Sequence, residues 1–281
     1  MDTARPAPDA STLARRRADF RALHAGGCFM LPNPWDAGSA RYLQSLGFQA
    51  IATTSSGHAW SQAQADGDLP VDAVLAHLRE MVAATDLPVN ADFEDGFGDS
   101  PEAVHRHVGL AVGTGVAGLS IEDGTGDASA PLYPIDVAVA RLQAARAAID
   151  AAGGDTLLVG RAENFFAGRP DLDDAIARLR AYADAGADCL YAPGIGTREQ
   201  IAAVVTAVAP KPVNVLVGRT SAFTLQDLAA MGVRRVSVGG ALARAAWGGF
   251  MRAADALRAG RFDGFDGAAQ GAQLNGLFRE A

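Results

Sequence analysis

A cluster of acidic residues follows an apolar, strand-like segment in the first half of the sequence. Residues 87–91 are largely apolar, and they lead directly into Asp92, Glu94 and Asp95 and then into Gly96. On a strand, residues two apart lie on one face, so we expect the side chains of Asp92 and Glu94 to lie together. Carboxylates of this kind bind hard cations such as Mg²⁺ or Mn²⁺. The alternative is a solvated acidic turn, because acids and glycine are common in turns.

Other polar residues follow apolar segments in the same way. They are the small polar turn Ser55, Ser56 and Gly57, the acids Glu122 and Asp123, Arg161 with Glu163, and Asn214. Carboxylates on neighbouring strands beside an arginine can hold a divalent cation and bind an anionic substrate against it. His58 is the only histidine next to these positions, which makes it a candidate catalytic residue. This arrangement favours a metal site over a solvated turn.

The sequence contains a single lysine, and this limits the chemistry of the site. Lys211 precedes Pro212, so it lies at the N-terminal end of a predicted strand, away from the other polar residues. An imine mechanism needs a lysine in the pocket, which argues against aldolase chemistry of that type. No Ser/His/Asp arrangement is apparent either. A metal ion that stabilises an enolate needs no lysine, and it is the remaining route to carbon–carbon bond change.

Eight apolar strand segments alternate with helical segments, and this alternation must position the polar residues. The predicted strands are 28–31, 50–54, 87–91, 118–121, 156–160, 189–192, 212–217 and 236–238. The predicted helices are 14–24, 37–46, 71–85, 101–113, 135–152, 172–185, 198–208, 225–231 and 241–258. Such a pattern predicts an α/β fold, a (β/α)₈ TIM-type barrel, whose active site lies where the strands end. A doubly wound open sheet is the alternative, but no G-x-G-x-x-G follows the first strand.

Composition and charge are typical of a soluble protein that binds small molecules. The 281 residues are 49% hydrophobic, yet no apolar run approaches the roughly 18 residues of a membrane span. A net charge of −8 argues against nucleic-acid binding. Residues 1–13 have no signal-peptide pattern and predict a flexible leader on a cytoplasmic protein, followed by the barrel at 14–263. Residues 264–281 form a tail in which Leu274, Leu277 and Phe278 make one apolar helical stripe that needs a partner.

The motifs at the strand ends resemble those of the isocitrate lyase/phosphoenolpyruvate mutase superfamily, especially its short-chain members. The family pattern D-x-D-x-G-[YF]-G corresponds to the segment from Asp92 to Gly98. The family I-E-D corresponds to Ile121, Glu122 and Asp123, A-R-x-E to residues 160–163, the S-G turn to Ser56 and Gly57, and the first βα turn to residues 33–37. The resemblance extends from about residue 20 to about residue 263. It departs from the family at Glu94, where most members have Asp.

The resemblance implies a Mg²⁺-dependent enzyme that acts on small 2-oxo or 2-hydroxy acids through a pyruvate-like enolate. By position, Asp92 would bind the metal directly, and Glu94, Glu122 and one of Asp66 and Asp68 would hold it through water. Ser56 and Gly57 would bind the substrate, and Arg161 would bind a carboxylate. The resemblance also implies that the last helix swaps between the subunits of a homo-oligomer, a dimer or a tetramer.

The sequence lacks a loop motif that family lyases carry, and this difference helps to distinguish the candidate reactions. Family lyases carry K-[KR]-C-G-H after the I-E-D segment, whereas residues 124–131 contain no Cys, Lys or His. Isocitrate lyase activity is therefore not expected, and the Lys and Asn of phosphoenolpyruvate mutases are missing too. We expect a metal-dependent carbon–carbon lyase, or its reverse, acting on an oxaloacetate-like or substituted malate-like acid. The alternatives are P–C bond chemistry on phosphonopyruvate and a barrel that binds a ligand without catalysis.

Overall fold

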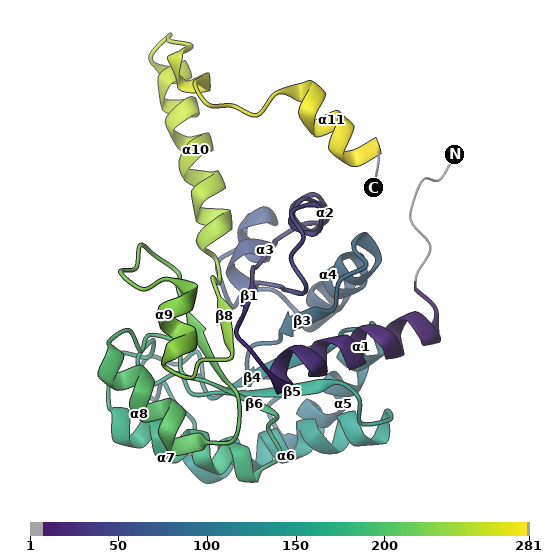
Figure 1. The fold of residues 1–281 in the computed structure, drawn as a ribbon, viewed down its shortest axis with the longest axis vertical. Helices are drawn as coiled ribbons and strands as arrows, with labels where there is room; N and C mark the ends of the chain where they lie inside the picture. Colours follow the sequence, from purple (N-terminus) through teal and green to yellow (C-terminus); the bar gives the residue numbers. More distant parts are fainter. Residues whose placement is uncertain (1–7, 280–281) are drawn as a thin grey trace.

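The computed structural model describes residues 8–279, in which eight parallel strands form a nearly closed (β/α)₈ barrel (Figure 1). Neighbouring strands pair in the order β1-β8-β7-β6-β5-β4-β3-β2. The strands are β1 (Phe29–Leu31), β2 (Ile51–Ala52), β3 (Val89–Asp92), β4 (Gly118–Glu122), β5 (Leu157–Arg161), β6 (Cys189–Tyr191), β7 (Val213–Leu216) and β8 (Arg235–Ser237). The barrel predicted from the alternation of strands and helices is confirmed.

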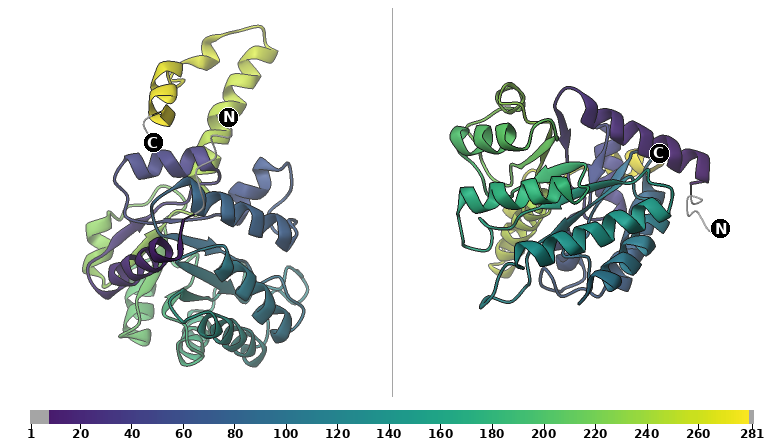
Figure 2. Two further views of the ribbon diagram at one scale, coloured as in Figure 1. Left: turned by 90° about the vertical axis from the view of Figure 1, so that its right-hand side faces the viewer. Right: turned by 90° about the horizontal axis from the view of Figure 1, so that it is seen from below.

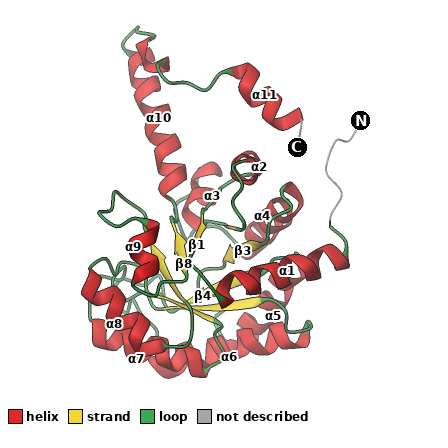
Figure 3. Cartoon of the chain, viewed as in Figure 1, coloured by secondary structure: helices red, strands yellow, loops and turns green. Residues whose placement is uncertain are grey.

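Helices surround the strands (Figure 3). They are α1 (Ala10–Ala25), α2 (Ala37–Ser45), α3 (Ser55–Ser61), α4 (Val71–Ala84), α5 (Pro101–Gly113), α6 (Ile135–Ala151), α7 (Leu172–Asp184), α8 (Arg198–Val208), α9 (Leu225–Ala230), α10 (Ala241–Arg258), the 3₁₀ helix η1 (Asp263–Phe265) and α11 (Gly271–Arg279). Local sequence sets where many of them begin. Ser100 caps α5, with Pro101 at its first position, and Thr197 forms a capping box with Gln200 at the start of α8. No described helix is long and apolar enough to cross a membrane.

The hydrophobic core has two layers. One layer fills the space between the strands and the outer helices, with Val89 and Ala91 of β3 among its residues. The other fills the barrel interior and includes Phe29, Leu157 and Phe20, the last of which comes from α1. Because side chains alternate along a strand, β3 sends Asn90 and Asp92 to the interior face instead.

Helix α1 covers the N-terminal ends of the strands, opposite the predicted site (Figure 2). Three of its arginines donate to backbone carbonyls in the segments that lead into β3, β4 and β5. Arg16 bonds Val82 O at 2.9 Å, Arg17 bonds Val112 O at 3.0 Å, and Arg21 bonds Gly154 O at 2.9 Å. The barrel is therefore closed at this end, and only its other end is free to hold a site.

A seam separates β1 from β2, which are not joined by strand pairing. One backbone bond crosses the seam, from Ala52 N to Pro32 O at 3.0 Å. The Asn33 side chain reinforces it: its Nδ2 donates to Thr53 O at 2.8 Å, and its Oδ1 accepts from the amides of Val238 and Gly239, each at 2.9 Å. A single amide thus ties β2 to the end of β8.

Several boundaries differ from the sequence-based predictions. Helix α1 begins at Ala10, so residues 10–13 are helical although the sequence placed them in the leader; residues 1–7 lie outside the described part. Ser55 was predicted to open a turn, but it opens helix α3, because Thr54 accepts from Gly57 N and caps a helix there. β8 begins at Arg235, one residue before the predicted strand.

The C-terminal segment projects from the barrel as an arm. Helix α10 extends away from the strands, and α11 returns toward α2 (Figures 1 and 2). The ring of Phe278 lies near Gly38 of α2, where an added Cβ would lie 3.5 Å from it. Many large apolar side chains of the arm are exposed, namely Trp247, Phe250, Met251, Leu257, Phe262, Phe265, Leu274 and Phe278. Exposed apolar surface of this extent marks an interaction surface.

Candidate active site

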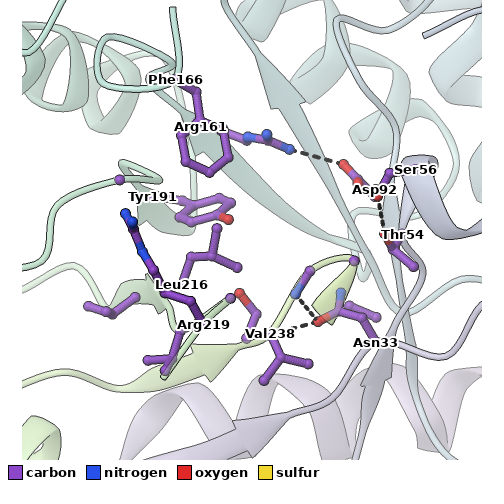
Figure 4. A pocket seen from close by; sticks show the side chains of 18 of the residues that line it. Asn33, Thr54, Ser56, Asp92, Arg161, Phe166, Tyr191, Leu216, Arg219 and Val238 are labelled. Atoms are coloured by element: carbon purple, nitrogen blue, oxygen red, sulfur yellow. Dashed lines mark hydrogen bonds and ion pairs between the residues drawn. The ribbon is translucent and has the colours of Figure 1, made fainter. Parts of the chain in front are cut away.

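A cavity of about 830 Å³ opens at the C-terminal ends of the strands (Figure 4). One wall is polar and is formed by Thr53, Ser55, Ser56, Asp66, Asn90, Asp92, Ser120, Arg161, Glu163 and Arg235. The remaining wall is largely apolar and is formed by Phe166, Tyr191, Ile195, Leu216, Val217 and Phe223. The mouth carries the exposed Arg219. This is the end of a (β/α)₈ barrel at which active sites lie.

Arg161 is the centre of the polar wall. Its Nη1 lies 3.2 Å from Asp92 Oδ1 and 2.9 Å from Glu122 Oε2, and its Nε donates to Glu163. Its guanidinium also lies over the ring of Tyr191, 5.2 Å from the ring centroid. Burial lowers the pKa of Arg161, but the charges of Glu122 and Glu163 outweigh burial and raise it. The side chain therefore remains a fixed cation held by carboxylates from three strands or strand ends.

The acids around Arg161 carry more negative charge than one guanidinium can balance. Burial raises the pKa of Glu122 and of Glu163, although Arg161 opposes both shifts. Burial and then the charges of Asp92, Asp66 and Asp95 raise the pKa of Glu94 to about 8. This part of the cavity is short of positive charge.

Asp92 is held in place by the first turn of α3. Its Oδ2 accepts from Ser55 N at 3.1 Å, and its own amide donates to Thr53 Oγ1 at 2.9 Å. The hydroxyls of Thr54 and Ser56 lie 3.1 Å apart beside it. Gly57 is fixed by packing, because a Cβ there would come within 2.8 Å of Trp35 Cβ. The sequence Thr-Ser-Ser-Gly thus builds a tight helix start against a strand-end carboxylate.

The acidic turn after β3 has an unusual backbone. Glu94 and Phe97 have φ of 45° and 55°, values that side-chain-bearing residues seldom adopt, and Gly96 has φ of 88°. The turn is stabilised by Arg141 of α6, which donates to Gly98 O at 2.7 Å, to Asp95 O at 2.8 Å and to Asp95 Oδ2 at 2.7 Å. Asp95 is therefore a structural residue of the motif. Glu94 leaves the strand in this turn, so it does not continue the strand of Asp92 as predicted, but its carboxylate stays close enough for the charge of Asp92 to raise its pKa.

Replacing Arg141 by methionine is expected to lower the free energy of unfolding by about 3–5 kcal/mol, because it leaves the turn's carbonyls and the Asp95 carboxylate without their buried partner. The side chain of Arg141 is only 2% exposed. Urea unfolding of the variant measures the change. Arg146→Met is the matched control on the same helix: its ion pairs with Asp150 and Asp188 are partly solvated, and a loss of about 1 kcal/mol is expected. Equal losses in the two variants would contradict a special role for Arg141.

Asp123 follows Glu122 but serves the scaffold. It is 1% exposed and accepts from Arg178 at 2.9 Å, from the Tyr182 hydroxyl and from Glu163 N at 2.7 Å. It does not line the cavity. Its hydrogen bond to Glu163 N fixes the residue that contacts Arg161, so it orients the site from behind.

The structure brings only some of the predicted site residues into the cavity. Ser55, Ser56, Asp66, Asp92 and Arg161 line it, whereas Gly57, Asp68, Glu94, Glu122, Asn214 and His58 do not. Glu122 nevertheless contacts Arg161, and Asn214 lies beneath the floor, where it bonds Ser237 and Arg235. Asp68 is exposed on its loop.

His58 does not reach the site that the sequence suggested for it. It points to the back of α3 and stacks on His77 of α4, with ring centroids 3.8 Å apart. Burial lowers the pKa of both rings, that of His77 to about 3. Helical geometry explains the difference, because in a turn His58 would follow Ser56 into the pocket, whereas in a helix it faces away.

Sequence reasoning missed several cavity residues. They are Asn33, Thr53, Asn90, Ser120, Tyr191, Arg235, Ser237 and the loop 218–223. Polar residues at alternating positions inside apolar strands are a signal that could have found Asn90, Ser120 and Arg235. Nothing in the sequence marks the loop, which is held by a bond from Arg244 to Gly218 O and by stacking of Arg198 on Phe223 at 5.5 Å.

The donor chemistry of the polar wall suits a magnesium ion. Within residues 8–279, no three His, Cys, Asp or Glu side chains already stand in a metal-binding arrangement, since Arg161 draws Asp92, Glu122 and Glu163 toward itself. Asp92, Asp66, Glu94 and Glu122 offer carboxylate oxygens, which are the ligands that Mg²⁺ prefers. The surplus of negative charge around Glu94 is what a divalent cation would compensate. The residues present therefore fit Mg²⁺ in type and charge.

Comparison with known proteins agrees with this geometry. Residues 20–258 match the sequence model of the phosphoenolpyruvate phosphomutase family. The chain belongs to this family. A Burkholderia cenocepacia crystal structure described as a lyase/mutase is 51% identical, with a TM-score of 0.92 over 95% of this chain and 98% of that one.

Two further members of the superfamily have named activities. Oxaloacetate decarboxylase of Rhodopseudomonas palustris is 32% identical over 206 residues, which cover 70% of this chain and 69% of that protein. A crystal structure of 2,3-dimethylmalate lyase, described as a member of the PEP mutase/isocitrate lyase superfamily, is 26% identical, with a TM-score of 0.82 over 96% of this chain and 95% of that one. The resemblance inferred from the strand-end motifs is confirmed.

Proposed function

We propose that this protein is a Mg²⁺-dependent carbon–carbon lyase, or its reverse, that acts on a small 2-oxo or 2-hydroxy acid. The observation that carries the proposal is the convergence of Asp92, Glu122 and Glu163 on Arg161 at one wall of the cavity. Relatives named oxaloacetate decarboxylase and 2,3-dimethylmalate lyase support the reaction class. Mn²⁺ is the alternative metal, because it prefers the same oxygen ligands.

Each part of the cavity has a role in this proposal. Asp92 would hold the metal, with Asp66, Glu94 and Glu122 around it, and when bound the metal supplies Lewis-acid stabilisation of negative charge on the substrate. Arg161 would bind and orient a substrate carboxylate, and Glu122 positions Arg161. The hydroxyls of Ser55 and Ser56 would donate to a substrate oxygen. The apolar wall formed by Phe166, Leu216 and Val217 would exclude water, which strengthens these interactions.

A substrate panel tests the proposal. The full-length protein is incubated with oxaloacetate, 2-methylmalate and 2,3-dimethylmalate, with Mg²⁺ or with a chelator, and products are followed by proton NMR. Mg²⁺-dependent loss of a carbon–carbon bond in any member, faster than in the same mixture without protein, supports the proposal. If none of the three acids is cleaved although they still bind, the result would favour a barrel that binds a ligand without catalysis.

P–C bond chemistry is the second candidate, because the matching family is that of phosphoenolpyruvate phosphomutase. Incubation with phosphonopyruvate and Mg²⁺, followed by phosphorus NMR, distinguishes it. New phosphate or phosphoenolpyruvate signals, without turnover of the dicarboxylic acids, would replace the lyase proposal by this one.

We further propose that the C-terminal arm exchanges between subunits of a dimer or tetramer, as the resemblance to the superfamily implies. Deletion of residues 264–281 is then expected to lower both the oligomeric state and the melting temperature, because Phe265, Leu274 and Phe278 lose their apolar partner surface. Light scattering measures the mass of the full-length and shortened chains. Leu274→Glu should weaken assembly, whereas Gln273→Glu on the same helix should not. A full-length monomer at micromolar concentration would contradict the exchange.

A further inference from the structure

Arg235 is a buried cation at the floor of the cavity. It opens β8, lines the cavity and is only 3% exposed. Its Nε donates to Asn214 Oδ1 on β7 at 3.0 Å, and its Nη1 donates to Asn90 Oδ1 on β3 at 3.3 Å. Since β3 lies across the barrel from β7 and β8 in the strand order, the guanidinium spans the barrel interior. Two neutral amides therefore fix its orientation.

No carboxylate neutralises this guanidinium. Among residues 8–279, Arg235 forms no ion pair, and its Nη2 forms no hydrogen bond, although the equally buried Arg141 and Arg178 each contact an aspartate. Burial lowers its pKa, yet an arginine side chain keeps its charge in proteins. A buried and uncompensated charge is costly to maintain. Such a group calls for an anion from outside the chain.

The two arginines inside the cavity, Arg161 and Arg235, have different charged surroundings. Arg161 is already surrounded by Asp92, Glu122 and Glu163, so without a metal its immediate surroundings are negative. Arg235 faces the amides of Asn90 and Asn214 together with Cys189, Tyr191 and Ser237, and among the carboxylates only Asp92 acts on its pKa. Strand pairing places Arg161 beside Tyr191, Tyr191 beside Asn214, and Asn214 beside Arg235. Because neighbouring strands are about 4.8 Å apart, the guanidinium groups of Arg161 and Arg235 line the same cavity from nearby strands.

We infer that Arg235 is the residue that anchors the second anionic group of the substrate. One carboxylate would lie at the Arg161 and Asp92 wall, and the second anion, a carboxylate or a phosphonate, would accept hydrogen bonds from the Nη atoms of Arg235. Asn90 and Asn214 keep the planar fork fixed, so little side-chain entropy is lost on binding. This inference rests on the proposed function, because it specifies the substrate of the same site.

Binding of three matched acids tests the inference without relying on turnover. Malate and 2-hydroxybutyrate differ only in a carboxylate in place of a methyl group, and 3-phosphonolactate carries a phosphonate there. Isothermal titration in the presence of Mg²⁺ is expected to show malate or phosphonolactate binding at least about 30-fold more tightly than 2-hydroxybutyrate. Whichever dianion binds more tightly identifies the second group as carboxylate or phosphonate.

Arg235→Met should abolish this preference by weakening dianion binding about 30-fold, while 2-hydroxybutyrate affinity changes less than about threefold. Arg106→Met is the matched control on the exposed face of α5, outside the cavity, where solvent screens the charge, and the preference should persist. If Arg235→Met does not fold, Asn214→Asp replaces it. That carboxylate, beside Nε, would neutralise Arg235 in place and should also remove the preference while retaining or raising the melting temperature.

Three outcomes would overturn the inference. The wild type could show no preference for a dianion, or the preference could survive Arg235→Met. The third outcome is an equal loss of affinity for all three acids in both the Arg235 and the Asn214 variants. The last would indicate a purely structural arginine. Failure of the proposed function looks different, because the dianion preference would stand while none of the bound acids is cleaved.

Discussion

Arg161→Lys is expected to lower kcat/KM by about 1,000-fold, although it preserves the charge. The guanidinium contacts three carboxylates at once and stacks on Tyr191, whereas an ammonium group is a point charge that cannot reproduce a planar fork. Without the planar guanidinium, Asp92 and Glu122 would lose their ion pairs, and the arrangement of the carboxylates around the cavity would be disordered. A change of this size corresponds to about 4 kcal/mol of lost transition-state stabilisation.

The comparison requires a variant that makes the same exchange elsewhere. Arg79→Lys on the exposed face of α4 should retain wild-type kcat/KM. Circular dichroism and thermal melting of both variants establish that they fold. If Arg161→Lys folds and keeps kcat/KM within about fivefold of wild type, the residue does not bind substrate as proposed.

Asp92→Asn is expected to lower the proposed Mg²⁺-dependent activity by about 1,000-fold or more, because it deletes the charge of the proposed direct metal ligand while nearly keeping its shape. The asparagine oxygen can still accept from Ser55 N, so the start of α3 should remain intact. Mg²⁺ titration of activity and calorimetry of Mg²⁺ binding measure the effect separately.

Asp68→Asn is the matched control for Asp92. It makes the same chemical change in the neighbouring acidic loop at a residue that is exposed and does not line the cavity. Its Mg²⁺ affinity should stay within about twofold of wild type. Undiminished activity of Asp92→Asn at saturating Mg²⁺ would remove Asp92 from the metal site, and a large effect of Asp68→Asn would place the metal in that loop instead.

The sequence was informative wherever one local rule determines both position and role. Parallel strands deliver their C-terminal residues to one end of a barrel, so Asp92 and Arg161 could be placed in one site without coordinates. The same rule could not predict the conformation of the two residues that follow β3. Glu94 leaves the strand conformation in a turn that Arg141, 47 positions further along, stabilises, and such a long-range bond leaves no local trace in the sequence.

His58 and Arg235 show two other limits of the sequence. A short polar segment can open either a turn or a helix, and for His58 that choice decides whether the ring faces the cavity or His77. Arg235 was overlooked because a charged residue beside a strand is normally assigned to its solvated end. Its burial depends on Asn90 and Asn214, which come from two other strands.

The seam between β1 and β2 has a consequence for biosynthesis. β1 has only β8 as a paired neighbour, and the Asn33 side chain that locks this edge bonds Val238, 205 residues later in the chain. At translation rates of roughly 5–20 residues per second, β1 leaves the ribosome on the order of 10 to 40 s before its partner strand is made. Until then Phe29 and Leu31 have no interior to fill. The nascent chain must therefore keep its first strand from aggregating, or have a chaperone do so, until the last strand completes the barrel.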